Sequence, residues 1–314
     1  MVSVHPHQTK PVSIYLSIYL RRGAMALAAL SGDEQCIVFS QLCNTLDPSV
    51  AVAFGSASSE LRESTQAPRQ QLKADYEAAA ALGRKAGKRS CKELREAKIV
   101  DFHLRGLSSD DLSLLGTLGS VLPALEDLRL IEPTAGHDGV QRLAEKLGAG
   151  ALPAVTLLDI DSTRVGDAGA SALAAALGRG ALPRLDHLTL CNAAIGDAGL
   201  VALAAALRRR SALISLRLMN NPLGDEGLAS IAAEAPGGTW PPKGGLPKLK
   251  ELNLEDTQVT DVGCATLISA FGSGTLPALQ KLVLRGIHAS AAAQHAVRDV
   301  SYECRVYVGA RRHL

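Results

Sequence analysis

A single pattern of apolar and polar residues recurs between residues 99 and 297. The arrangement L-P-x-L-x-x-L-x-L, or a close variant, begins at residues 122, 152, 182, 210, 246 and 276, so successive copies start 30, 30, 28, 36 and 30 residues apart. The longest step contains a Pro- and Gly-rich insert, residues 235–245, which we expect to be a surface loop. A weaker copy, KIVDFHLRGL, precedes the others and has Ile99, Phe102 and Leu104 at the apolar positions. The sequence therefore contains seven copies of one repeat.

Each copy predicts one short strand followed by one helix. The last two apolar positions alternate with polar residues, as Leu128 and Leu130 do around Arg129, which is the period of a strand with one buried face. The second half of the repeat is rich in alanine and has leucines four residues apart, for example Leu173 and Leu177, which is typical of a helix. Each repeat is therefore predicted to fold as strand, turn and helix.

Residues that begin and end helices recur in register with this pattern. Asp167, Asp197 and Asp225 stand in G-D-x-G sequences, where a carboxylate can accept hydrogen bonds from the free amide groups at the start of a helix. Gly178 and Gly180 follow one predicted helix and are expected to end it. We therefore expect each aspartate to cap the helix in which it stands.

One repeat cannot fold alone, so neighbouring repeats must share their apolar faces. About five buried aliphatic side chains contribute roughly 8–15 kcal/mol, whereas ordering about thirty residues costs several times as much. Stacked repeats form a continuous parallel sheet on one side and a layer of helices on the other, and the wider helix layer bends the stack into an arc.

The pattern L-x-x-L-x-L, followed by G-D-x-G and an alanine- and leucine-rich helix, resembles the leucine-rich repeat of the ribonuclease-inhibitor type. The resemblance covers residues 99–297 and implies the α/β fold class, with a horseshoe-shaped solenoid that has parallel strands inside and helices outside. That family usually has Asn or Cys after the strand, and here Asn221 fits. The other copies have Pro133, Thr163, Ala193, Thr257 and Ile287 there. We therefore expect looser turns than in the family.

The sequence before the repeats predicts a small helical unit over residues 25–98, after a loose leader of residues 1–24. Apolar Ile37, Val38 and Phe39 lead to Leu42, an LDP sequence and an alanine- and valine-rich segment. This order resembles a degenerate F-box, a module that docks a Skp-type adaptor of a ubiquitin ligase, and the resemblance assigns the adaptor to residues 30–61. The alternative is a helical cap that shields the apolar edge of the first repeat. Residues 298–314 are expected to form a C-terminal tail.

Composition narrows the function classes. The chain has 314 residues, of which 47% are apolar and only 3% aromatic, so the core is aliphatic. A net charge of +2 and few aromatic rings argue against nucleic acid as a partner. Apolar runs fall short of the roughly eighteen residues that span a bilayer, so we expect no membrane partner. Six cysteines without a CxxC pair are typical of reduced thiols, which favours the cytoplasm, and the basic stretch 84–92 leaves the nucleus as an alternative.

Motifs that carry catalysis are absent from the sequence. It contains no phosphate-binding loop, nucleophile elbow, HExxH zinc motif or dinucleotide fingerprint. His187 and Cys191 could share a strand face, but two potential ligands do not make a metal site. We therefore predict that the chain is not an enzyme, with no catalytic residues, cofactor or bound metal.

The outward strand positions are the candidate binding site, because these side chains can vary without disturbing the core. They mix acids, bases and a few apolar residues, which suits a protein surface better than a deep ligand pocket. We predict a monomeric scaffold that binds a protein partner on the inner face. The alternatives are a substrate-recognition subunit of a ubiquitin ligase and a GTPase-activator-like regulator. The candidate residues are Asp127, Arg129, Asp159, Asp161, His187, Arg217, Met219, Glu251, Asn253, Lys281 and Arg285.

Overall fold

The protein is described here by a computed structural model that covers residues 30–132, 135, 138–209, 212–233, 246–301 and 304–309. The predicted leader and the insert at residues 235–245 lie outside the described residues. Contacts divide the chain into two compact units. The first, which we call the helical unit, runs to Arg84 and includes Lys88–Leu94, and the second, the solenoid, comprises Lys85–Gly87 and the residues from Arg95 onward.

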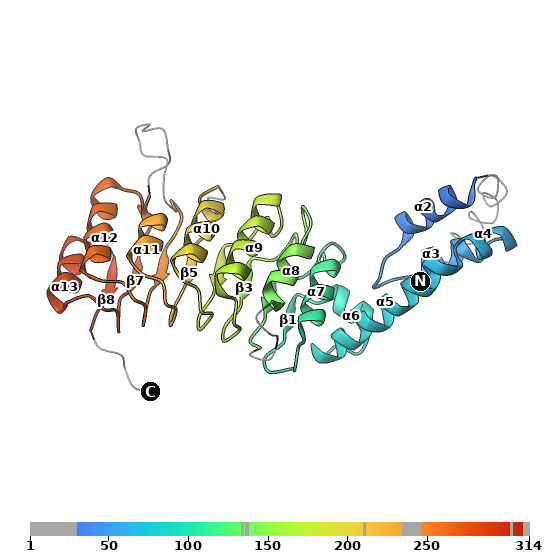
Figure 1. Cartoon of the computed structure of the whole chain (residues 1–314), viewed down its shortest axis with the longest axis horizontal. Coiled ribbons are helices and arrows are strands. Elements are labelled where there is room, and N and C mark those ends of the chain that lie inside the picture. The colour runs from blue at the N-terminus through green and yellow to red at the C-terminus, as the bar shows by residue number, and fades with distance from the viewer. Residues whose placement is uncertain are drawn as a thin grey trace, which may run out of the picture. The chain divides into compact units, whose positions relative to one another are not determined.

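The helical unit has an apolar core of its own. Its described helices are α2 (Gly32–Leu42), α3 (Ser49–Gly55), α4 (Ser59–Ser64), α5 (Gln66–Lys85) and the start of α6 (Cys91–Glu96) (Figure 1). Phe39 of α2 and Phe54 of α3 place their ring centroids 6.4 Å apart, and Leu61 and Leu72 pack with them. At the start of α2, Ser31 and Glu34 form a capping box.

The solenoid alternates strands and helices, as the repeat pattern predicts. Eight strands of the described chain form one parallel sheet in sequence order. The strands are β1 (Ile99–Asp101), β2 (Asp127–Arg129), β3 (Leu157–Asp159), β4 (His187–Thr189), β5 (Ser215–Arg217), β6 (Glu251–Asn253), β7 (Lys281–Val283) and β8 (Arg305–Tyr307). The helices are α7 (Ser109–Leu118), α8 (Gly139–Lys146), α9 (Gly166–Arg179), α10 (Asp197–Arg208), α11 (Asp225–Ala232), α12 (Asp261–Ser273) and α13 (Ala291–Val300), stacked side by side in Figure 1.

The middle residue of each strand forms the buried face of the sheet. In β2 to β7 this residue is a leucine with at most 1% of its surface exposed, and the pairing register aligns the six leucines across the sheet. The helices cover this face with leucines such as Leu173 and Leu203, which are also buried. The prediction of an α/β solenoid with shared apolar faces is confirmed.

The register predicted for the first repeat is wrong by two residues. Val100, not Phe102, pairs with Leu128 at the centre of the sheet. Phe102 is buried at the next inward position, whereas Ile99 and Leu104 are 54% and 63% exposed. Because strand side chains alternate with a period of two, a shift of two residues preserves the alternation, and apolar spacing alone could not detect it.

The sheet continues one strand further than the repeats visible in the sequence. β8 pairs in parallel with β7, and it lies within residues 298–314, which the sequence analysis set apart as a tail. Its sequence, Arg305–Tyr307, has no leucine, so the repeat pattern could not reveal it. Val306 stands opposite Leu282 and is only half-buried.

The aspartates of the G-D-x-G sequences connect neighbouring repeats. Asp167 stands in the first turn of α9, yet its Oδ1 accepts hydrogen bonds from the amides of Gly196 and Gly199, at 2.7 and 3.0 Å, at the start of α10. The same contact recurs at Asp197 with Gly224 and Gly227, at Asp225 with Thr260, and at Asp261 with Ser290.

The expectation that each aspartate caps its own helix is therefore wrong. The residues at the caps of α9, α10 and α11 are Val165, Gly196 and Gly224, whose side chains cannot accept a hydrogen bond. The carboxylate instead satisfies the free amides of the next helix, where the positive end of that helix also favours a negative charge. The motif is thus a contact between repeats.

Replacing Gly199 with alanine should destabilise the solenoid by about 1–3 kcal/mol, although alanine favours helix more than glycine. A Cβ atom at Gly199 would lie 2.6 Å from Oδ1 of Asp167 and 3.0 Å from Cγ2 of Ile195. Gly178 in α9 is the matched control, because a Cβ there has no neighbour within 4 Å, and its replacement should stabilise by up to ~1 kcal/mol. Urea unfolding of both variants measures the two effects, and equal shifts would contradict the close approach.

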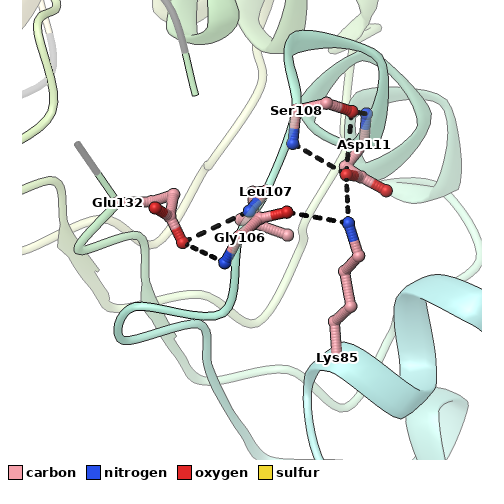
Figure 2. A network of polar contacts seen from close by, with 6 residues as sticks. All are labelled: Lys85, Gly106, Leu107, Ser108, Asp111 and Glu132. Atoms are coloured by element: carbon pink, nitrogen blue, oxygen red, sulfur yellow. Dashed lines mark hydrogen bonds and ion pairs between the residues drawn. The ribbon is translucent and has the colours of Figure 1, made fainter. Parts of the chain in front are cut away.

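Polar side chains close the turns that follow the strands. Asn221, the residue that fits the family position, is 3% exposed and makes five hydrogen bonds with backbone groups. At the turn after β1 a carboxylate has this role. Glu132, which follows β2, is 2% exposed, and its Oε2 accepts hydrogen bonds from the amides of Gly106 and Leu107 at 2.6 and 3.2 Å (Figure 2). Glu132 was not predicted from the sequence, because it stands one residue before the family position, which Pro133 occupies.

The same turn is held from its other side by Lys85. Its Nζ donates to the carbonyl oxygen of Gly106 at 2.9 Å and lies 2.7 Å from the carboxylate of Asp111 (Figure 2). Thr163 has the same role at the turn after β2. Its hydroxyl accepts a hydrogen bond from the amide of Glu132 and donates one to the carbonyl of Leu130. Carboxylate and hydroxyl groups thus replace the missing amides at these two turns.

Candidate protein-binding face of the sheet

The pairing register arranges the outward strand residues in rows that cross the sheet. Backbone hydrogen bonds continue the register past the strand ends, for example from the amide of Ser162 to the carbonyl of Cys191. The first row is Asp127, Leu157, His187, Ser215, Glu251 and Lys281, and the second is Arg129, Asp159, Thr189, Arg217, Asn253 and Val283. The third, just after the strands, contains Ile131, Asp161, Cys191, Met219, Glu255 and Arg285. We call these three rows the strand face.

Carboxylates dominate the strand face over β1 to β4. Asp127 and Arg129 form a two-point ion pair, with Oδ2–Nη2 and Oδ1–Nε distances of 2.7 and 3.2 Å, and this raises the pKa of Arg129. Asp101 extends the second row beside Arg129. Asp101 faces outward in either register, but it was not among the predicted residues because the predicted rows began with the repeat that starts at residue 122.

Asp159 is the least satisfied of these carboxylates. Its Oδ1 is buried and has no hydrogen-bond partner within the described residues. Burial raises the pKa of Asp159, and the nearby negative charge of Asp161 raises it further. Asp161 itself accepts a hydrogen bond from Nδ2 of Asn192 at 2.8 Å. A cation brought to this place would therefore relieve an unfavourable charge arrangement.

The centre of the strand face is less exposed than the alternation predicts. Cys191 and Ser215 are each 4% exposed, although both occupy outward positions. Burial raises the pKa of the Cys191 thiol to about 11, so the thiol is protonated at neutral pH and a poor nucleophile. His187 is half-buried, and its Nδ1 lies 2.6 Å from Oδ1 of Asp186, which the sequence analysis did not single out.

Cations dominate the strand face over β5 to β8. Glu251 lies between two of them, with Arg217 Nη2 at 3.1 Å and Lys281 Nζ at 2.7 Å. Arg285 lies over the ring of Tyr307, with its Cζ atom 5.3 Å from the ring centroid. Tyr307 was missed in the sequence because β8 was not expected.

Glu251 should titrate below its ordinary pKa of 4.5 and Asp159 above its ordinary pKa of 3.8. Burial opposes the charge of Glu251, but the hydrogen bonds from Lys281 and Arg217 outweigh it. Because the folded-state pKa is depressed, this ion triad stabilises the fold at neutral pH and loses its contribution as the pH falls through that pKa. Carboxyl carbon NMR titration measures both groups.

Changing Arg217 and Lys281 together to methionine should then raise the pKa of Glu251 above 4.5, because burial would outweigh the remaining hydrogen bond from the hydroxyl of Ser215, at 3.3 Å. Arg285→Met is the control, since Arg285 contacts Tyr307 instead. An unchanged pKa in the double variant would contradict the proposed cause.

No group of three His, Cys, Asp or Glu side chains in the described part of the chain is placed to hold a metal ion. None of the described helices is long and apolar enough to cross a bilayer.

Comparison with known proteins gives a family match to parts of the chain. Residues 153–174, 212–232 and 245–267 match the family model for the leucine-rich repeat. No curated protein matches the chain in sequence. Among solved structures, the chain is similar to an internalin from Listeria monocytogenes, at 14% identity over 69% of this chain and 67% of the internalin chain, with a TM-score of 0.35. Each matched segment contains one strand, β3, β5 or β6, and part or all of the helix that follows.

Proposed function

We propose that this leucine-rich repeat solenoid is a non-enzymatic scaffold of the ribonuclease-inhibitor type that binds a protein partner on its strand face. Leucine-rich repeat domains generally serve as scaffolds for protein–protein interaction. The middle leucines and the contacts between repeats maintain the fold, so most side chains of the strand face are free for recognition.

The observation that carries the proposal is the separation of charge along the strand face. Over β1 to β4 four aspartates stand against one arginine, a net charge of −3. These residues are Asp101, Asp127, Asp159, Asp161 and Arg129. Over β5 to β8 four cations stand against two glutamates, a net charge of +2. These residues are Arg217, Lys281, Arg285, Arg305, Glu251 and Glu255. A partner with the opposite arrangement, cationic toward β1 and acidic toward β8, would be oriented by this field.

Affinity purification of the tagged full-length chain, followed by mass spectrometry, tests the proposal. The variant Asp159→Ala/Asp161→Ala should lose the partner at least tenfold, because partner cations would lose their carboxylates. Glu145→Ala/Glu226→Ala is the matched control, since it removes two exposed carboxylates from helices α8 and α11 with the same change in net charge. Equal recovery of every partner by both variants would overturn the strand face as the contact site. A GTP hydrolysis assay with a panel of small GTPases tests the GTPase-activator-like alternative.

A second candidate function concerns residues 30–61 as an F-box-like module that docks a Skp-type adaptor, which would make the chain a substrate-recognition subunit of a ubiquitin ligase. The separate core formed by Phe39, Phe54 and Leu61 favours an independent module over a simple cap. Ile37 on α2 is 61% exposed and is the apolar side chain best placed for such docking. A pull-down with a recombinant Skp-type adaptor tests it, and the adaptor should be retained by the full chain but not by Ile37→Asp.

A further inference from the structure

The helical unit carries an open, mostly apolar groove on its surface. The groove has a volume of about 660 Å³ and lies between α3, α4 and one face of α5. Leu72 lines it and is only 4% exposed, whereas Val52 on α3 is 42% exposed. Gln66, Lys73 and Tyr76 also line it, and their spacing along α5 places them on one side of that helix. The exposed valine beside the buried leucine leaves apolar surface in contact with water, which is unfavourable until another apolar surface covers it.

Cationic side chains line the same groove. Arg62 on α4 and Arg69 and Lys73 on α5 contribute three positive charges, against the single carboxylate of Glu63. Lys73 lies 3.9 Å from Glu77, but both side chains are more than two-thirds exposed, so this pair is weak. The long aliphatic stems of the three cations add apolar surface to the walls. Arg62 and Lys73 are exposed, whereas Arg69 is half-buried and its Nη1 donates to the carbonyl oxygen of Gly55 at 3.4 Å.

We propose that this groove binds an amphipathic helical segment of another protein, whose apolar face is flanked by acidic residues. The apolar side chains of such a helix would contact Val52 and Leu72, and its carboxylates would meet Arg62, Arg69 and Lys73. The chain's own N-terminal sequence VSIYLSIYL is a poor occupant, because Arg21 and Arg22 follow it directly and have the same sign as the groove. The site is independent of the strand face and does not rest on the function proposed for it.

A yeast-displayed library of amphipathic helices tests the proposal. Each member has leucine along one face and either Glu or Lys at the flanking positions, and the labelled full-length chain serves as the bait. We expect selection to enrich Glu over Lys at least tenfold at the flanking positions. The variant Arg62→Glu/Lys73→Glu should reverse that preference, and since both side chains are exposed the fold should be preserved.

Val52→Asp should weaken the selected helices at least tenfold, because it places a charge against their apolar face. The matched control is Val262→Asp, an exposed apolar residue on α12 that does not line the groove, and it should leave binding unchanged. Three outcomes would each overturn the proposal. They are full binding of the selected helices by Val52→Asp, a selected library without a preference for Glu or Lys, and displacement of the helices by a single-stranded oligonucleotide. The last outcome would identify the cations as a phosphate site.

Discussion

Replacing Asp197 with alanine should lower the free energy of unfolding of the solenoid by about 2–4 kcal/mol. Its Oδ1 accepts hydrogen bonds from the amides of Gly224 and Gly227, at 2.6 and 2.9 Å, at the start of α11. These amides have no acceptor within their own helix, and the buried Gly227 offers water little access. Removing one carboxylate therefore leaves two donors unsatisfied and weakens the contact between α10 and α11.

Two companion variants separate this contact from a general loss of charge. Glu226→Ala removes an exposed carboxylate from the first turn of the same α11 and should cost at most about 1 kcal/mol. Asp197→Asn keeps an oxygen that can accept both hydrogen bonds and should recover part of the loss. Urea unfolding followed by circular dichroism gives the free energies, and hydrogen exchange at Gly224 and Gly227 locates the change. Equal losses in Asp197→Ala and Glu226→Ala would contradict the contact between repeats.

The aspartates show how far the sequence alone could lead. Their residue type and their place at the start of a helix predicted that they accept hydrogen bonds from amides, and they do. The sequence could not tell which helix supplies the amides, because the distance between neighbouring helices depends on how the repeats stack. The structure shows that Gly199 makes the contact possible, because a residue without a side chain leaves room for the carboxylate of Asp167.

The strand positions were predictable wherever leucine marked both inward sites. In the first repeat valine and phenylalanine replace those leucines, and the nearby Ile99 and Leu104 offered an equally good match two residues away. At the other end, Arg305–Tyr307 joins the sheet through backbone pairing, which requires no particular side chains. The apolar pattern depends on residues that pack against a neighbouring repeat on both sides. The first and last strands have only one such neighbour, so the pattern did not locate them correctly.

On the strand face, alternation predicted which residues point outward but not what surrounds them. The rows follow from the register, which the aligned leucines in the middle of the strands mark in the sequence although the steps between repeats vary from 28 to 36 residues. The burial of Cys191 and Ser215 and the orphaned oxygen of Asp159 depend on the sizes and charges of side chains in adjacent repeats. Those contacts join residues about thirty positions apart, and a single sequence carries no direct sign of them.

Replacing Asn221 with alanine should cost about 3–5 kcal/mol. Its Oδ1 accepts from the amides of Ala193 and Ile195 at 3.2 and 3.0 Å. Its Nδ2 donates to the carbonyls of Leu190 and Leu218 at 2.7 and 2.9 Å, and to that of Met219 at 3.2 Å. A methyl group satisfies none of these, and little water can replace the amide because the residue is 3% exposed.

Asn253→Ala is the control, because Asn253 is half-buried on the strand face and accepts one hydrogen bond, from the amide of Glu255 at 2.9 Å. Its cost should be about 1 kcal/mol or less. Asn221→Asp keeps the acceptor but turns a second oxygen toward the carbonyls of Leu190 and Leu218, so it should destabilise at least as much as alanine. If urea unfolding instead found the Asp variant as stable as the native chain, the donors of Asn221 would contribute nothing, and the turn would depend on the acceptor oxygen of this residue alone.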